Sequence, residues 1–106
     1  MKIVIIGSTQ YEERIITWAE MERARGNEVK VPSFDDIEEF DELGICKYNR
    51  KLIKWADEVH IIWDQRSTGT IFDFGMCFAL EKPIKLVYLE QKTFTGVMKK
   101  YEKEVK

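Results

Sequence analysis

Two carboxylates, Asp64 and Asp73, lie within ten positions of each other in a stretch rich in hydroxyl residues. Asp73 follows Thr70 by three positions, so in a helix both side chains project from the same side. A carboxylate beside the free N–H groups of a helix N-terminus stays ionised, as a nucleophile must. Two plainer interpretations stay open: Asp73 complements the helix dipole, and Asp64 is a loop residue.

Strand-like and helix-like segments alternate along the chain. Apolar runs typical of buried parallel strands cover residues 2–6, 29–31, 59–63 and 84–89. Helical spacing predicts a helix between Thr9 and Gly26, and further helices over 45–56, over 70–81 and from 93 onward. This order predicts an α/β fold, a small doubly wound, Rossmann-like parallel sheet of roughly four to five strands with helices on both faces. Right-handed crossovers favour the strand order 2-1-3-4.

Apolar spacing also predicts which helix residues pack inward. The first helix begins with a capping box from Thr9 to Glu12, and Glu22 begins the polar margin of its apolar stripe Ile15, Trp18 and Ala19. In the helix over 70–81, Gly75 allows close packing on the sheet, and the expected inward residues are Ile71, Phe74, Cys77 and Phe78. The last helix has its apolar positions at Val97, Met98, Tyr101 and Val105.

The loops after the first and third strands are the expected binding site. Ligands of open α/β sheets bind beyond the carboxyl ends of the strands, where the strand order reverses. Residues 7–10 and 64–70 meet there, and each loop leads into a helix whose N–H groups and dipole attract anions. The sequence therefore predicts a crevice for a small phosphorylated or hydroxylated ligand.

The stretch ADEVHIIWDQRSTGTIFDFGMCFALEKPIKLV resembles the signature of the nucleoside 2-deoxyribosyltransferase-like family. Gly69-Thr70 match the family's Gly-Thr pair, Asp73 occupies the position of its glutamate, Gly75 matches its glycine, and Lys82-Pro83 end the helix. The opening KIVIIGSTQ is similar to the family's first strand and loop. The resemblance covers residues 2–31 and 55–89.

The resemblance implies an enzyme that cleaves N-glycosidic bonds. Asp73 would be the nucleophile that attacks the anomeric carbon of a 2-deoxyribonucleoside and expels the base, and a second base or water would then capture the sugar. Asp64 would orient the sugar hydroxyls or protonate the departing base. Ser67 stands where relatives that act on nucleoside 5′-monophosphates have a serine that contacts phosphate.

The remaining candidate contacts come from the two loops and their flanks. Arg14 and Arg66 are candidate phosphate partners, because a guanidinium pairs with two phosphate oxygens. The expected substrate-binding residues are Gly7, Ser8, Thr9, Tyr11, Trp63, Arg66, Ser67, Gly69 and Thr70.

One departure from the family pattern leaves two functions open. Asp73 is one methylene shorter than the family's glutamate, and a misplacement of about 1 Å costs roughly a hundredfold in rate. The first function is a nucleoside 2-deoxyribosyltransferase or a deoxynucleoside 5′-monophosphate N-glycosidase. The second is a non-catalytic nucleotide-binding module that uses the same crevice.

Length, net charge and cysteine content limit the domain organisation and the kinds of partner that the sequence allows. The 106 residues predict a single domain over 1–106, and a net charge of −2 argues against a nucleic-acid partner. No apolar run approaches the length of a membrane span. The two cysteines match no metal spacing and are expected to be reduced, in a cytoplasmic protein without metal or cofactor. The family resemblance implies a homodimer or larger homo-oligomer, and the acidic segment 33–44 is either a lid or a surface loop.

Overall fold

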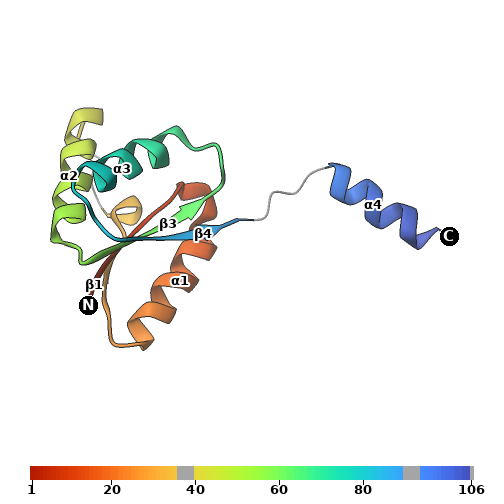
Figure 1. Cartoon of the computed structure of the whole chain (residues 1–106), viewed down its shortest axis with the longest axis horizontal. Coiled ribbons are helices and arrows are strands. Elements are labelled where there is room, and N and C mark those ends of the chain that lie inside the picture. The colour runs from red at the N-terminus through yellow and green to blue at the C-terminus, as the bar shows by residue number, and fades with distance from the viewer. Residues whose placement is uncertain (36–39, 90–93, 106) are drawn as a thin grey trace.

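Four parallel strands form one sheet in the order β2-β1-β3-β4, as predicted (Figure 1). The computed structural model describes residues 1–35, 40–89 and 94–105. Its strands are β1 (Lys2–Ile6), β2 (Glu28–Lys30), β3 (Glu58–Trp63) and β4 (Ile84–Tyr88). Its helices are α1 (Glu12–Ala24), α2 (Glu42–Trp55), α3 (Thr68–Ala79) and α4 (Phe94–Glu104), with the short 3-10 turns η1 (Thr9–Tyr11) and η2 (Pro32–Phe34). The predicted α/β class is confirmed.

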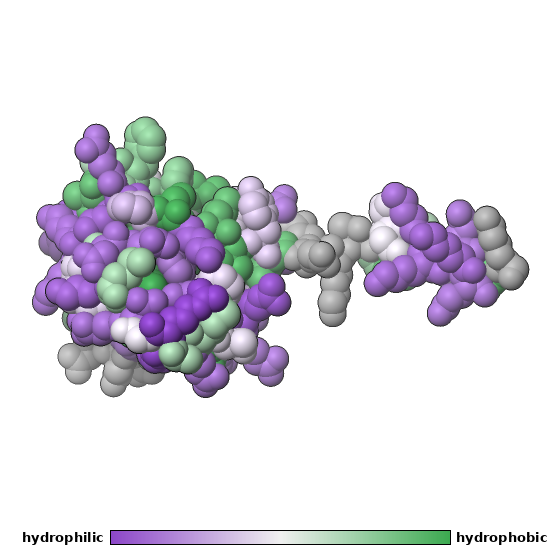
Figure 2. Space-filling view, turned by 60° about the horizontal axis from the view of Figure 1, so that its bottom comes forward, coloured by the Kyte–Doolittle hydropathy of each residue, from purple (hydrophilic) through white to green (hydrophobic). Residues whose placement is uncertain are grey.

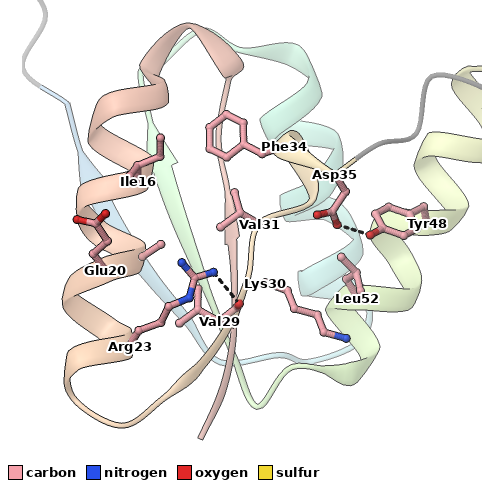
Figure 3. A pocket seen from close by; sticks show the side chains of 11 residues that line it. Ile16, Glu20, Arg23, Val29, Lys30, Val31, Phe34, Asp35, Tyr48 and Leu52 are labelled. Carbon is pink, nitrogen blue, oxygen red and sulfur yellow. Dashed lines mark hydrogen bonds between the residues drawn. The ribbon is translucent and has the colours of Figure 1, made fainter.

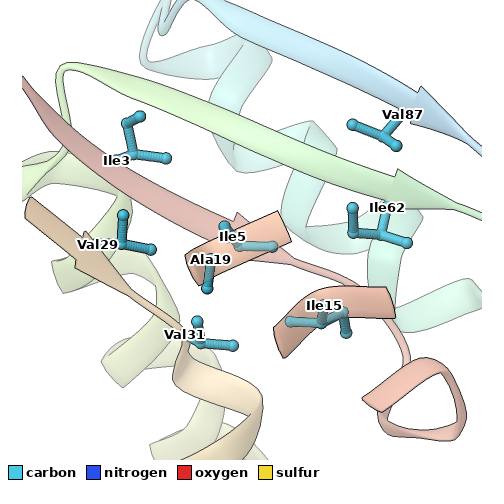
Figure 4. Packing of buried hydrophobic residues seen from close by; sticks show 8 residues of the cluster. All are labelled: Ile3, Ile5, Ile15, Ala19, Val29, Val31, Ile62 and Val87. Atoms are coloured by element: carbon cyan, nitrogen blue, oxygen red, sulfur yellow. The ribbon is translucent and has the colours of Figure 1, made fainter. Parts of the chain in front are cut away.

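Helices cover both faces of the sheet. Figure 1 shows α1 on one side and α2 with α3 on the other. Alternate residues of each strand therefore enter two separate apolar clusters. Figure 4 shows the cluster on the α1 side, which joins Ile3 and Ile5 of β1 to Ile15 of α1 and Ile62 of β3. The other cluster joins Val4 and Ile6 to Ile53 of α2 and Cys77 of α3.

The start of α1 differs from the prediction. The capping box is wrong, because Thr9 lies inside η1 and neither Ser8 nor Tyr11 makes a side-chain cap hydrogen bond. Glu22 is buried instead of beginning a polar margin, and it accepts hydrogen bonds from Arg25 Nη1 and Asn27 Nδ2, both at 2.9 Å. These bonds tie the end of α1 to the turn that leads into β2.

Helix α2 begins three residues earlier than predicted. Asp41 is its N-cap residue, and its Oδ1 accepts a hydrogen bond of 2.7 Å from the Gly44 N–H. A capping carboxylate satisfies an N–H group that the first helical turn leaves free. Residues 36–39, in the middle of the segment predicted as a lid or loop, lie outside the described residues.

Helix α3 is rotated relative to the prediction. Cys77 is buried as expected, but Ile71, Phe74 and Phe78 are exposed, Phe78 at 76%. The buried polar residue on this helix is Thr70, which shares the inward face with Cys77. The expectation for Gly75 is also wrong, because a Cβ atom there would meet nothing within 4 Å. Apolar side chains surround most of α3, so their spacing alone does not identify the packed face.

Helix α4 stands apart from the sheet in Figure 1. The residues predicted as its apolar face, Val97, Met98, Tyr101 and Val105, are all exposed. Among the described helices, none has the length and apolar character needed to cross a membrane.

Candidate functional site

The loops that follow β1 and β3 are in direct contact. Tyr11, at the end of η1, donates a hydrogen bond from its hydroxyl to Oδ2 of Asp64 at 3.3 Å. Strands β1 and β3 are neighbours in the sheet, so their carboxyl ends bring these loops together. The predicted juxtaposition of the two loops is therefore present.

Asp64 is buried and organises the loop between β3 and α3. Its Oδ1 accepts hydrogen bonds from the N–H groups of Arg66 at 3.0 Å and Ser67 at 2.8 Å. Burial by itself would raise the pKa of Asp64, but these bonds and the one from Tyr11 outweigh it and hold the pKa below its ordinary value of 3.8. Gln65, between the bonded residues, has a positive φ of 68° that completes the tight turn. An ionised carboxylate so arranged shapes the loop and is a poor proton donor.

The start of α3 is capped by its own hydroxyl residues. Ser67 is the N-cap residue, and its Oγ accepts hydrogen bonds from Thr70 N–H at 3.4 Å and from Thr70 Oγ1 at 3.0 Å. Arg66 beside it is exposed, with Nε 3.9 Å from Oδ2 of Asp64. Gly69 is exposed, and a Cβ atom on it would meet nothing within 4 Å, so the space beside the first turn of α3 is open. These features leave room for an anion at this helix end.

Gly7 closes the other side of the site. A Cβ atom there would lie 3.0 Å from Cβ of Ile62 and 3.2 Å from Cδ1 of Ile15, so a larger residue would push the loop outward. Its carbonyl oxygen accepts a hydrogen bond of 3.0 Å from Ser33 Oγ, which follows β2. The carboxyl ends of three strands thus meet at Gly7.

Asp73 lies one turn further along α3, in a different environment. Its Oδ1 accepts a long hydrogen bond of 3.4 Å from Asn49 Nδ2 on α2. Burial raises the pKa of Asp73 to about 6, against the opposing effect of the Asn49 bond. Burial and then the charge of Asp73 raise the pKa of the Cys77 thiol to about 11, which makes this cysteine unreactive. Asp73 is therefore a poorly solvated carboxylate that titrates near neutral pH.

Besides Gly7, Gly69 and Ser8, which directly precedes η1, the predicted site residues fall into three groups. Tyr11, Asp64, Arg66, Ser67 and Thr70 are joined by the hydrogen bonds and the ion pair of the two loops. Asp73 contacts α2 instead, and Trp63 packs against the cluster beneath α2 and α3. Thr9 and Arg14 are exposed and line shallow surface hollows near Tyr11.

Two polar residues of this region did not appear among the predicted ones. Ser33 follows β2, whose carboxyl end lies beside that of β1, so the rule that selected the other loops would have included it. Asn49 lies on the inward side of α2 between Tyr48 and Leu52, and an amide among apolar positions was the available signal.

A separate hollow of about 490 Å³ lies between α1, β2 and α2 (Figure 3). Charges of both signs line it, and Arg23 is already occupied, since its Nη2 donates to the carbonyl oxygen of Val29 at 3.1 Å. Tyr48 donates its hydroxyl to Asp35, and this bond raises the pKa of Tyr48 to about 12. These contacts hold the edge strand β2 and the turn after it between α1 and α2.

No metal centre is evident among residues 1–35, 40–89 and 94–105, where no three His, Cys, Asp or Glu side chains gather closely enough to hold an ion. Cys46 and Cys77 are both free thiols.

Comparisons with known proteins point to one fold. No family model and no curated protein matches the sequence. A 2-deoxyribosyltransferase from Bacillus psychrosaccharolyticus matches with a TM-score of 0.72 at 21% identity, over 90% of this chain and 79% of that one. A 2-desoxiribosyltransferase from Leishmania mexicana gives 0.69 at 18% identity, over 86% and 66%. A CMP N-glycosidase from Clostridium botulinum gives 0.66 at 21% identity, over 87% and 72%. The resemblance read from the sequence is thus confirmed at the level of the fold.

Proposed function

We propose that this protein cleaves the N-glycosidic bond of a 2-deoxyribonucleoside or its 5′-monophosphate, with Asp73 as the nucleophile. The supporting observation is the carboxyl group of Asp73, partly buried on α3 with a pKa of about 6. It occupies the position of the family glutamate, in a chain that shares its fold with two deoxyribosyltransferases and an N-glycosidase.

The environment of Asp73 suits a nucleophile at neutral pH. With a pKa of about 6 the carboxylate outnumbers the acid by roughly ten to one at pH 7. A carboxylate oxygen would form a bond to the anomeric carbon while the glycosidic C–N bond breaks and its electron pair leaves with the base. A second base or water would then displace the carboxylate from the sugar. A nearby negative charge stabilises the oxocarbenium-like transition state of both steps.

Asp64 would position the loop and the start of α3 would bind the substrate, and neither would react with it. Because the pKa of Asp64 is held low, protonation of the departing base is an unsuitable role for it, and we assign it to positioning the loop. The N–H groups at the open helix end, with the exposed guanidinium of Arg66, would hold a 5′-phosphate. The alternative function, a nucleotide-binding module, uses these same contacts without cleavage, and the short aspartate side chain favours it.

A base-release assay separates the two functions. The protein would be incubated with 2′-deoxynucleosides and their 5′-monophosphates, with and without a second base, and free base would be measured by chromatography. We expect release by the natural protein and a loss of at least about a thousandfold in Asp73→Asn, since an amide cannot form the glycosyl bond.

Asp41→Asn is the matched control, because asparagine caps a helix as well as aspartate does. It should release base at the unchanged rate. Base release by Asp73→Asn at the rate of the natural protein would contradict the assignment of Asp73 as the nucleophile. Bound but intact ligand throughout the panel would establish the binding module instead.

A further inference from the structure

An uncovered apolar groove runs between α3 and β4. It has a volume of about 330 Å³ and is lined by Ile71 and Phe74 of α3 and by Ile84 and Leu86 of β4, with Trp63 and Thr70 at one end. Figure 2 shows apolar side chains gathered on the globular body. A sheet face and a helix face that both expose large apolar side chains ordinarily have a partner.

The groove exists because α3 covers β3 but not the edge strand. Ile84 is paired in register with Val59, and Leu86 with Ile61, so these β4 side chains point to the same face as the core beneath α2 and α3. Val59 and Ile61 are buried there, while Ile84 and Leu86 are 39% and 41% exposed. One further helix beside α3 would complete this layer.

Helix α4 has the matching surface. Its apolar residues Phe94, Val97, Met98 and Tyr101 follow one another at helical spacing, so they form a single stripe that Val105 extends just after the helix, and all five are exposed. Figure 2 views α4 largely onto its hydrophilic side. An isolated helix of 11 residues is marginal in water, so this stripe requires a surface to pack against.

Lengths and topology favour the chain's own α4 as the occupant. Six residue steps separate Tyr88 from Phe94, which allows a reach of about 20 Å. Helix α4 is about 16 Å long, equal to the length of the five-residue strand β4. The right-handed connections through α2 and α3 both lie on this face, and the uncovered surface beside α3 belongs to β4, the strand that directly precedes α4 in the chain.

We propose that α4 folds back into the groove between α3 and β4 of its own chain and covers Leu86 and Phe74 with its apolar stripe. Docked there, α4 lies next to Trp63 and Thr70 and forms an outer wall beside the candidate site. The inference stands on packing alone and is independent of the proposed function.

Hydrogen exchange of the full chain tests the docking. If α4 is docked, the amides of residues 97–105 exchange at least about tenfold more slowly than in the isolated peptide, and equally so at all protein concentrations. Exchange at the rate of the free peptide would overturn the proposal. Protection that appears only as concentration rises, together with a doubled mass, would assign the groove to a second copy and would also overturn it.

A matched pair of variants links protection to the stripe. Met98→Gln places an amide on the apolar stripe, and Lys99→Gln makes the same replacement on the polar side of the same helix turn. Both residues are exposed in the undocked arrangement, so neither change endangers the folding of the sheet. We expect Met98→Gln to lose protection over 97–105 and Lys99→Gln to keep it. Equal protection in the two variants would contradict packing through the stripe.

Discussion

Asp64 and Asp73 are nine residues apart, yet the fold places them in opposite electrostatic environments. Asp64 is buried against two backbone N–H groups and a tyrosine hydroxyl, and its pKa is lowered. Asp73 is partly buried with a long bond to one amide, and its pKa is raised to about 6. The number of donors, rather than burial, therefore decides the direction of the shift. Two carboxyl groups whose pKa values are shifted in opposite directions can take different roles, one in positioning the site and the other in the reaction.

The largest expected effect concerns the pH dependence of base release. Each pH unit below 6 lowers the ionised fraction of Asp73 about tenfold, so the rate at pH 4 should be about a hundredfold below its plateau. Rates measured from pH 4 to 8 check this. Recovery of the full rate on return to pH 7.5 is the control against acid unfolding. A flat profile down to pH 4 would contradict Asp73 as the ionising group.

Removal of the well-bonded carboxylate should destabilise the protein. Asp64→Ala leaves the N–H groups of Arg66 and Ser67 without their acceptor, and should lower the free energy of unfolding by about 2–3 kcal/mol in urea at pH 7. Asp64→Asn retains an acceptor oxygen and should lose about 1 kcal/mol. Because the folded pKa is depressed, the contribution of Asp64 is present above pH 3.8 and is lost as pH falls through the folded value. Equal losses in the two variants would contradict the hydrogen-bond explanation.

Asp73→Asn should have the opposite effect on stability. The folded state holds the proton of Asp73 up to about pH 6, whereas the unfolded chain releases it near 3.8, so the natural protein loses stability between these values. The variant should therefore be more stable by on the order of 1–2 kcal/mol above pH 6, with no gain below pH 3.8. Urea unfolding at pH 3.5 and pH 8 measures the difference. Stabilisation that is equal at both pH values would rule out the buried charge as its cause.

The smallest effect concerns Asn49. Asn49→Leu removes the donor to Asp73 at similar side-chain volume and should raise the pKa of Asp73 by up to about one unit. Carboxyl chemical shifts followed through a pH titration report both aspartates. The pKa of Asp64 is the internal control and should stay unchanged. A lowered pKa for Asp73 would contradict the assigned contact.

Much of the fold could be predicted because it follows from local pattern and general topology. Apolar runs located the four strands, and the handedness of crossovers ordered them correctly. The neighbouring loops after β1 and β3 followed from that order. The capping box at Thr9 was wrong, because an η1 turn competes with the helix for the same residues.

The sequence by itself determined the strand order, the meeting of two loops, and the presence of two carboxylates near one helix start. Only the tertiary structure decided the hydrogen-bond partners of each carboxylate and the direction in which its pKa is shifted. Hydrogen bonds to Asp64 depend on a turn at Gln65, and the partner of Asp73 comes from α2, 24 residues away. The sequence also left undecided which face of α3 is packed, because apolar residues lie on nearly all sides of this helix. Contact with α2 and β3 selects the packed face. The spacing of apolar residues shows which faces of a helix are able to pack. The contacts with neighbouring elements decide which of those faces is buried.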